Sequence, residues 1–131
     1  MAVTGAVVGS VALLFIAPSV AGAVTITQNS ANQTTSITGL NGDSTCEEMP
    51  MVGRVVKRTF DRDALSLREF VIEKPDGARE LINVDTTGLA GVELGNVDNG
   101  LQRLTKVGRI VHGRVALCGV SGAVGVLDDI R

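Results

Sequence analysis

Residues 67–85 read LREFVIEKPDGARELINVD, and this stretch decides the fold class. In its first half, Phe70 and Ile72 alternate with Glu69 and Glu73, as in a half-buried β-strand. The tetrapeptide KPDG at 74–77 is a strong hairpin signal, because Pro fixes φ and Gly can adopt the left-handed conformation. The apolar residues of 79–85 follow at once. The stretch therefore predicts two strands, 67–73 and 79–85, joined by a tight turn.

A further strand is predicted on the N-terminal side of this hairpin. Residues 51–60 carry Val52, Val56 and Phe60 at even spacing, which places these three side chains on one face of an extended chain. The polar residues that follow form a turn. The predicted domain thus begins with three consecutive strands.

The C-terminal side of the hairpin predicts one short helix and two strands. Residues 86–96 contain three glycines and are expected to form a loop. Asp98 is a candidate cap for a helix over 99–106, and Gly108 is a candidate stop. Apolar runs at 109–118 and 123–130 then predict the fourth and fifth strands.

The order of these elements, with glycines at the expected strand bends (Gly53 and Gly113), resembles the OB-fold over residues 46–131. The resemblance implies a mainly β domain: a small five-stranded barrel with one short helix between the third and fourth strands. It also implies that the first strand pairs antiparallel with the fourth. A different small barrel and an α+β sheet with one helix are the alternatives.

The N-terminus has the pattern of an export signal. No charged residue precedes Asp43, residues 6–17 form an apolar core, and Ala21-Gly22-Ala23 offers small residues for cleavage after Ala23. We therefore expect residues 1–23 to be a signal peptide and the mature protein to be periplasmic or secreted, with no membrane span. The alternative is an uncleaved membrane anchor over 2–24, since 23 uncharged residues can span a bilayer. Residues 24–45 are rich in Thr, Ser, Asn and Gln and are expected to form a flexible tether.

The chain has two cysteines, Cys46 and Cys118. In an exported protein they are expected to form one disulfide. The OB-fold resemblance fits this expectation, because Cys46 precedes the first strand of the domain and Cys118 ends the fourth. Two free buried thiols in a protein that is not exported are the alternative.

No catalytic or metal motif accompanies this organisation, and we predict no cofactor. His112 is the only histidine, and it lies among the apolar residues of a predicted strand, where a structural role is common. The pairs Glu47-Glu48 and Asp128-Asp129 point to opposite faces of an extended chain, so we expect them to be solvated surface groups. The glycines between 119 and 125 lack the Lys-Ser/Thr of a phosphate loop.

The best candidate for a contact surface is basic. Arg58, Arg62 and Arg68 fall on the first two predicted strands of the domain and the turn between them, a region that carries ligands in OB-folds. Acidic residues are interleaved with them, and the chain has no Trp or Tyr for base stacking, which argues against nucleic acid. The formal net charge of −2 provides no general attraction for nucleic acid or anionic membrane.

These observations predict an exported, non-enzymatic binding module, from a bacterial envelope, for a protein or carbohydrate partner. Two alternatives stay open: a small hydrolase or nuclease that uses His112, and a membrane-anchored structural subunit of a larger assembly. The sequence does not define the oligomeric state.

Overall fold

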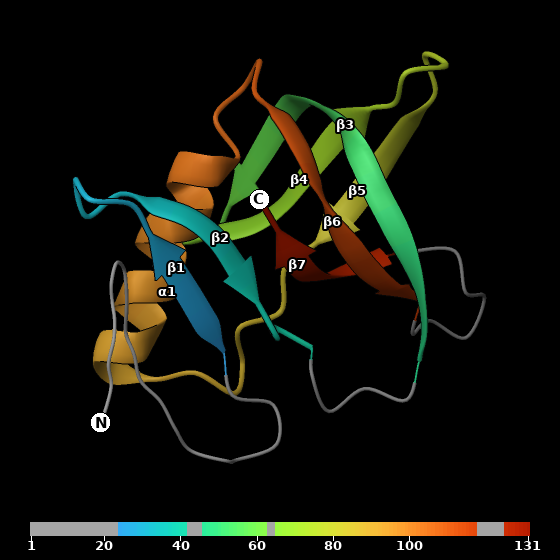
Figure 1. Cartoon of the computed structure of the whole chain (residues 1–131). Helices are drawn as coiled ribbons and strands as arrows, with labels where there is room; N and C mark the ends of the chain where they lie inside the picture. The colour runs from blue at the N-terminus through green and yellow to red at the C-terminus, as the bar shows by residue number, and fades with distance from the viewer. Residues whose placement is uncertain (1–23, 42–45, 63–64, 118–124) are drawn as a thin grey trace.

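The structure is a computed structural model that describes residues 24–41, 46–62, 65–117 and 125–131. The described residues form seven strands and one helix (Figure 1). In chain order these are β1 (Thr25–Gln28), β2 (Thr34–Thr38), β3 (Glu47–Phe60), β4 (Leu67–Glu73), β5 (Arg79–Asn83), α1 (Gly91–Leu104), β6 (Ile110–Leu117) and β7 (Gly125–Ile130). The helix among the described residues is not long and apolar enough to cross a membrane.

Five of the strands close into a barrel. The order around it is β7-β5-β4-β3-β6, and β6 returns to pair with β7. All pairings in the barrel are antiparallel except that of β5 with β7, which is parallel. The helix lies between β5 and β6, which are the third and fourth strands of the barrel. The predicted fold class, a mainly β five-stranded barrel with one helix at this point, is confirmed.

The predicted hairpin is also confirmed. β4 and β5 pair from Glu73 opposite Arg79 to Glu69 opposite Asn83. In the turn between them, the Gly77 amide donates to the Lys74 carbonyl at 2.8 Å, and Gly77 has a φ of +89°. The local signals of the sequence therefore place the turn and β4 correctly, whereas β5 ends at Asn83, two residues before the predicted end at Asp85.

The long strand β3 pairs with two neighbouring strands and curves over the barrel (Figure 1). Its first half pairs with β6, from Glu47 opposite Leu117 to Arg54 opposite Ile110, and its second half pairs with β4. Gly53 lies where the neighbour changes. A Cβ atom on Gly53 would lie 2.8 Å from the Glu73 carbonyl oxygen, so any other residue here would displace β4.

The evenly spaced apolar residues of this strand do not form its buried face. Met51, Gly53 and Val55 are buried, whereas Val52 is exposed and Val56 and Phe60 are half-buried. Both faces of residues 51–60 carry apolar side chains, so an alternating pattern alone cannot choose between them. The core that results is built from aliphatic side chains around the single buried aromatic of the described residues, Phe70.

The helix is longer than predicted. It begins at Gly91 instead of Asn99, so the predicted loop over 86–96 is wrong from residue 91 onward. Asp98 lies within the helix and does not cap it. Its carboxylate accepts hydrogen bonds from the Leu67 amide at 3.0 Å and from the Gln102 side chain at 2.8 Å. The glycines lower the helix propensity of this segment. Burial of the apolar face of the helix (Val97, Leu101 and Leu104) stabilises it all the same.

The predicted flexible tether is, in part, a β-hairpin. β1 and β2 pair antiparallel from Thr25 opposite Thr38, and β2 joins the barrel where Ile37 lies opposite Ile130. Ile37 is completely buried. The hairpin lies beside α1 (Figure 1), and this contact with the helix and with β7 orders a segment whose sequence lacks a continuous apolar face. Residues 42–45 lie outside the described part of the chain, as does the predicted signal peptide over 1–23.

Candidate functional site

The β1–β2 turn is shaped by one asparagine. The Asn29 side-chain oxygen accepts hydrogen bonds from the amides of Ala31, at 2.9 Å, and Gln33, at 3.0 Å. Asn32 has a φ of 61°, a left-handed conformation that asparagine tolerates better than most residues. The turn therefore has a defined shape although all its residues from 28 to 33 are exposed.

The helix presents a matching face to this hairpin. Asn96, Asn99, Gly100 and Arg103 recur at the three- and four-residue spacing that places side chains on one side of a helix. The close contact in this face is at Gly100, where a Cβ atom would lie 2.9 Å from Thr34 Cγ2 and 3.0 Å from Ile37 Cδ1. Because Gly100 has no side chain, β2 can approach the helix backbone directly.

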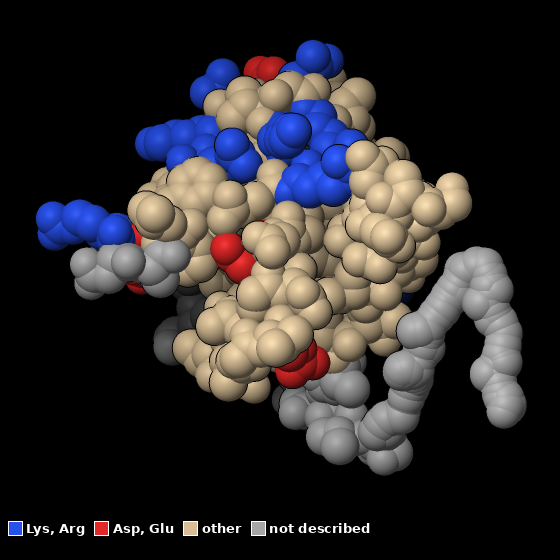
Figure 2. Space-filling model, turned by 90° about the vertical axis from the view of Figure 1, so that its left-hand side faces the viewer, with Lys and Arg blue, Asp and Glu red and all other residues tan. Residues whose placement is uncertain are grey.

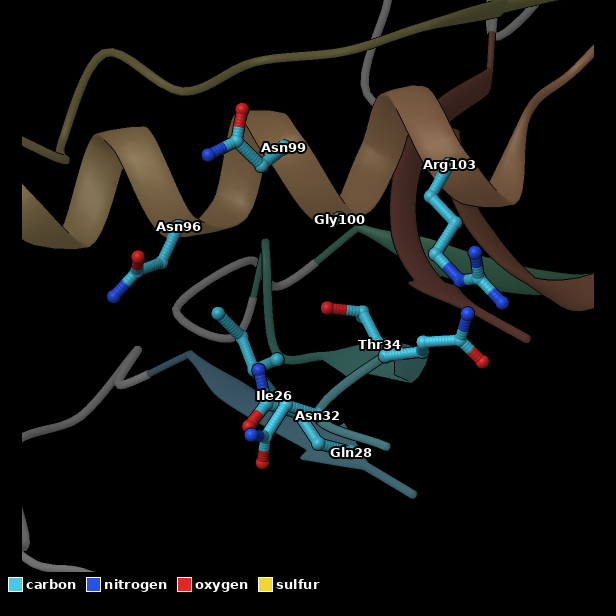
Figure 3. Close-up of a pocket in the computed structure, with 9 residues that line it drawn as sticks. Ile26, Gln28, Asn32, Thr34, Asn96, Asn99, Gly100 and Arg103 are labelled. Atoms are coloured by element: carbon cyan, nitrogen blue, oxygen red, sulfur yellow. The ribbon is translucent and has the colours of Figure 1, made fainter. Parts of the chain in front are cut away.

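Between hairpin and helix lies an open groove of about 480 Å³. Its lining is Ile26, Gln28, Asn32, Gln33 and Thr34 from the hairpin, and Asn96, Asn99, Gly100 and Arg103 from the helix. Figure 3 shows Asn96 and Arg103 extending from α1 toward the hairpin, whereas the amide of Asn99 is turned away from it. The volume lies within the range of about 300–1,000 Å³ that is usual for small-ligand sites.

The groove is rich in carboxamide groups. Five of its nine lining residues are Asn or Gln, Arg103 adds a guanidinium, and no acidic residue is present. Within the described part of the chain, the side chains of Asn32, Asn96 and Arg103 make no hydrogen bond to another protein group. Each carboxamide offers both donors and an acceptor. The groove can therefore form many hydrogen bonds with an uncharged polar ligand.

No sequence motif marks this site. The predicted tether includes the residues of the turn, and no motif surrounds the helix residues Asn96 and Asn99. The one sequence signal that points to the site is its composition, because four of the six residues from 28 to 33 are Asn or Gln.

Among the predicted binding residues, Arg58 has a structural contact. Its Nη1 atom donates to the Gln102 carbonyl oxygen near the end of α1, at 3.1 Å, and its guanidinium lies 5.1 Å from the centre of the Phe60 ring. Arg62 and Arg68 are exposed, in the β3–β4 connection and on β4 respectively. No hydrogen bond joins any two of these three side chains within the described residues. Their role in binding stays a prediction.

His112 lies in the middle of β6, as predicted. Its side chain is exposed, and its main chain forms two hydrogen bonds with Arg131, at 2.9 and 2.8 Å. Val52 lies opposite it on β3. The described residues contain no group of three or more His, Cys, Asp or Glu side chains that could hold a metal ion.

One acidic pair differs from the prediction of solvated surface groups. Asp128 is only 7 % exposed, and its carboxylate accepts a hydrogen bond from the Asn41 amide at 2.9 Å. Burial, and hydrogen bonding with Glu48, raise the pKa of Asp128. The neighbouring Asp129 accepts from the Gly39 amide at 3.0 Å. Both aspartate side chains therefore hold the residues that follow β2 against β7. Their carboxylate oxygens accept hydrogen bonds from backbone amides, whereas those of a solvated surface pair would be hydrated.

The predicted disulfide involves a residue outside the described part of the chain, Cys118. The register of the two strands that lead to it is defined, because Glu47 lies opposite Leu117 in the β3–β6 ladder. Cys46 directly precedes Glu47 in the sequence, and Cys118 directly follows Leu117.

Comparisons with known proteins returned no similarity: no family model matches the chain, and no curated protein or solved structure matches it. The function must therefore be argued from the geometry.

Proposed function

We propose that this chain is an exported, non-enzymatic binding module whose hairpin–helix groove holds a carbohydrate of the cell envelope. The observation that carries the proposal is the carboxamide lining of the groove, with five Asn or Gln residues and no carboxylate. A bacterial periplasm or exterior is the compartment that the sequence of residues 1–23 favours.

Carbohydrate fits this lining better than a charged ligand does. Vicinal sugar hydroxyls each donate and accept, and a carboxamide can engage two of them at once through its oxygen and its nitrogen. Arg103 adds further donors in a planar fork. Ile26 supplies the one apolar wall against which the C–H face of a sugar can pack. A ligand anion would be attracted by Arg103 alone.

The proposal is tested by titrating a panel of envelope oligosaccharides into the full chain and into two variants, Asn96→Ala and Glu93→Ala. Asn96 lines the groove and extends toward the hairpin, whereas Glu93 is an exposed residue of the same helix outside the groove lining, so the second variant is the control. Loss of one or two hydrogen bonds is expected to weaken binding roughly tenfold in Asn96→Ala. Glu93→Ala should bind nearly as the parent does.

Urea unfolding of both variants checks that a loss of affinity does not come from a loss of the fold. If no saccharide in the panel binds, or if the two variants lose affinity equally, the groove is not the carbohydrate site.

The finer fold proposal is an OB-like barrel. Its support is the strand order β3-β4-β5-β7-β6 with a helix before the fourth barrel strand, the order of elements on which the sequence resemblance rests. The groove lies against α1 and the N-terminal hairpin. It is therefore separate from the β3–β4 connection, where an OB-fold ligand surface would be expected.

Export and the disulfide are parts of the same proposal. The β3–β6 register supports a Cys46–Cys118 bond, since both residues lie one step beyond the Glu47–Leu117 pair. N-terminal sequencing of the secreted protein is expected to start at Val24. A retained Met1 would contradict cleavage and favour the membrane-anchored alternative.

A further inference from the structure

Basic residues gather at the connection between α1 and β6. Two long stretches of the sequence contain no Asp or Glu, namely 49–60 and 99–127, and together they hold seven of the twelve Lys and Arg residues. The β3–β6 pairing brings the two stretches side by side. Figure 2 shows Lys and Arg side chains gathered over the upper part of the face that carries α1, with Asp and Glu sparse among them.

The connection itself is fixed against β3. The Gly108 amide donates to the Val55 carbonyl at 2.8 Å, and the Val55 amide donates to the Arg109 carbonyl at 2.9 Å. Gly108 has a φ of +97°, which the turn requires and which other residues rarely adopt. The connection therefore presents its side chains in one defined arrangement.

The side chains of this turn alternate between basic and apolar. Lys106 and Arg109 are exposed, Val107 is 61 % exposed and Ile110 is 54 % exposed. Arg54, which pairs with Ile110, and Lys57, three residues further along β3, are also exposed and add two cations. We call these six residues the α1–β6 patch.

We propose that the α1–β6 patch is a peripheral contact with an anionic lipid surface, into which the turn inserts Val107. Apolar insertion and attraction between Lys or Arg and anionic headgroups add together in such contacts. Glu73 lies opposite Arg54 in the β3–β4 ladder and offsets part of its charge, whereas residues 99–127, which carry Lys106 and Arg109, contain no acidic residue. The net charge of the chain matters less than this local excess of cations, because fields decay within about 10 Å at moderate salt. A soluble polyanion would use the four cations but would leave Val107 in water.

The chain contains no Trp, so one introduced tryptophan reports its own surroundings. We would place it in the full chain as Val107→Trp and, in a second variant, as Val92→Trp. Val92 is 80 % exposed in the first turn of α1, about 20 Å from the patch along the helix. Both variants have the same N-terminus, whether or not it is cleaved. A difference in emission between them therefore reports on the turn that carries Val107.

The expected result is a blue shift of Val107→Trp emission with phosphatidylglycerol vesicles, and no shift with phosphatidylcholine vesicles. Val92→Trp should shift with neither. In the Val107→Trp background, adding Lys106→Glu and Arg109→Glu should weaken the apparent affinity at least about tenfold, since each basic residue contributes a severalfold factor.

A control with the same change in net charge, Lys74→Glu with Arg79→Glu on the β4–β5 hairpin, should keep the affinity of the parent. Circular dichroism must show that each variant is folded. The proposal is overturned if Val107→Trp does not shift, if Val92→Trp shifts equally, or if the charge control weakens binding as strongly. It is also overturned if dextran sulfate or an acidic peptide binds the patch while phosphatidylglycerol vesicles do not.

Discussion

Gly100 of α1 lies in direct contact with Thr34 of β2, so closely that a Cβ atom on the glycine would lie 2.9 Å from Thr34 Cγ2. Thr34 is itself buried, and both residues line the base of the carboxamide groove. This contact holds the N-terminal hairpin against the helix and therefore sets the width of the groove.

We predict that Gly100→Ala destabilises the protein by about 1–3 kcal/mol, the usual cost of adding a methyl group where no space exists. Gly95→Ala is the matched control in the same helix, because nothing lies within 4 Å of its Cβ position. That substitution should stabilise the protein by up to about 1 kcal/mol through helix propensity. Urea unfolding of the two variants measures the difference, and equal effects would contradict the close contact.

Asp128 is predicted to make stability depend on pH. Its pKa is raised in the folded state, above the ordinary value of 3.8, by burial and by hydrogen bonding with Glu48. The folded protein therefore takes up a proton before the unfolded chain does, and this group makes the fold more stable as the pH falls through the raised pKa. The gain is complete once the pH is below 3.8, where both states are protonated.

Asp128→Asn should therefore be more stable than the parent at pH 7, with the difference shrinking toward pH 4. The asparagine oxygen can still accept from the Asn41 amide. Asp128→Ala removes that acceptor and should be destabilised at both pH values by about 1–3 kcal/mol. Thermal unfolding at the two pH values distinguishes these outcomes. A parent protein that loses no stability relative to Asp128→Asn as the pH rises would contradict the assignment.

Arg58 is predicted to contribute to the stability of the fold, whereas Arg62 and Arg68 are predicted to contribute little. Arg58→Ala loses the hydrogen bond to the Gln102 carbonyl and the contact with the Phe60 ring, at a cost of about 1–3 kcal/mol. Alanine at the two exposed positions should change the free energy of unfolding by less than about 0.5 kcal/mol.

Because Arg58 has a structural contact, the basic contact surface predicted from the sequence is better tested at Arg62 and Arg68 alone. Charge reversal at Arg62 and Arg68 leaves the Arg58–helix contact in place. If binding to an envelope extract is unchanged by Arg62→Glu with Arg68→Glu, these two residues do not contribute to recognition.

We predict that Cys46 and Cys118 form a disulfide bond, because the proposed export would place them in an oxidising compartment. After unfolding without reductant, neither cysteine should react with a thiol reagent, and both should react once the protein is reduced. Reduction is expected to cost up to about 4 kcal/mol, because the bond closes a loop of about 72 residues in the unfolded chain. Two reactive thiols before reduction would exclude the bond.

The sequence predicted those elements whose signals are local. The strand over 67–73 was located to the residue, because alternation and the KPDG turn act within a few residues of one another. The start of α1 was missed, since Gly91 and Gly95 lower helix propensity while burial against the barrel outweighs it. Burial of this kind depends on residues far away in the chain.

The groove was missed for the same reason. Its two walls, around Asn32 and Asn96, are separated by about sixty residues and meet only because Gly100 admits β2. Carboxamide side chains also occur in ordinary loops, so no motif distinguishes those that line a groove. The basic residues Arg58, Arg62 and Arg68 were chosen by their charge and by their place on the first two predicted strands of the domain, and neither reveals that Arg58 donates to a helix carbonyl.

The last strand of the barrel, β7, pairs with β2, β5 and β6. Until β7 is in place, β5 and β6 each present an open edge and the N-terminal hairpin has no strand to join. Folding must therefore bring together segments about ninety residues apart, and such long-range pairing is slow compared with local hairpin formation. The barrel therefore cannot close until Gly125–Ile130 has been synthesised, and the earlier strands stay without one of their partners through most of translation.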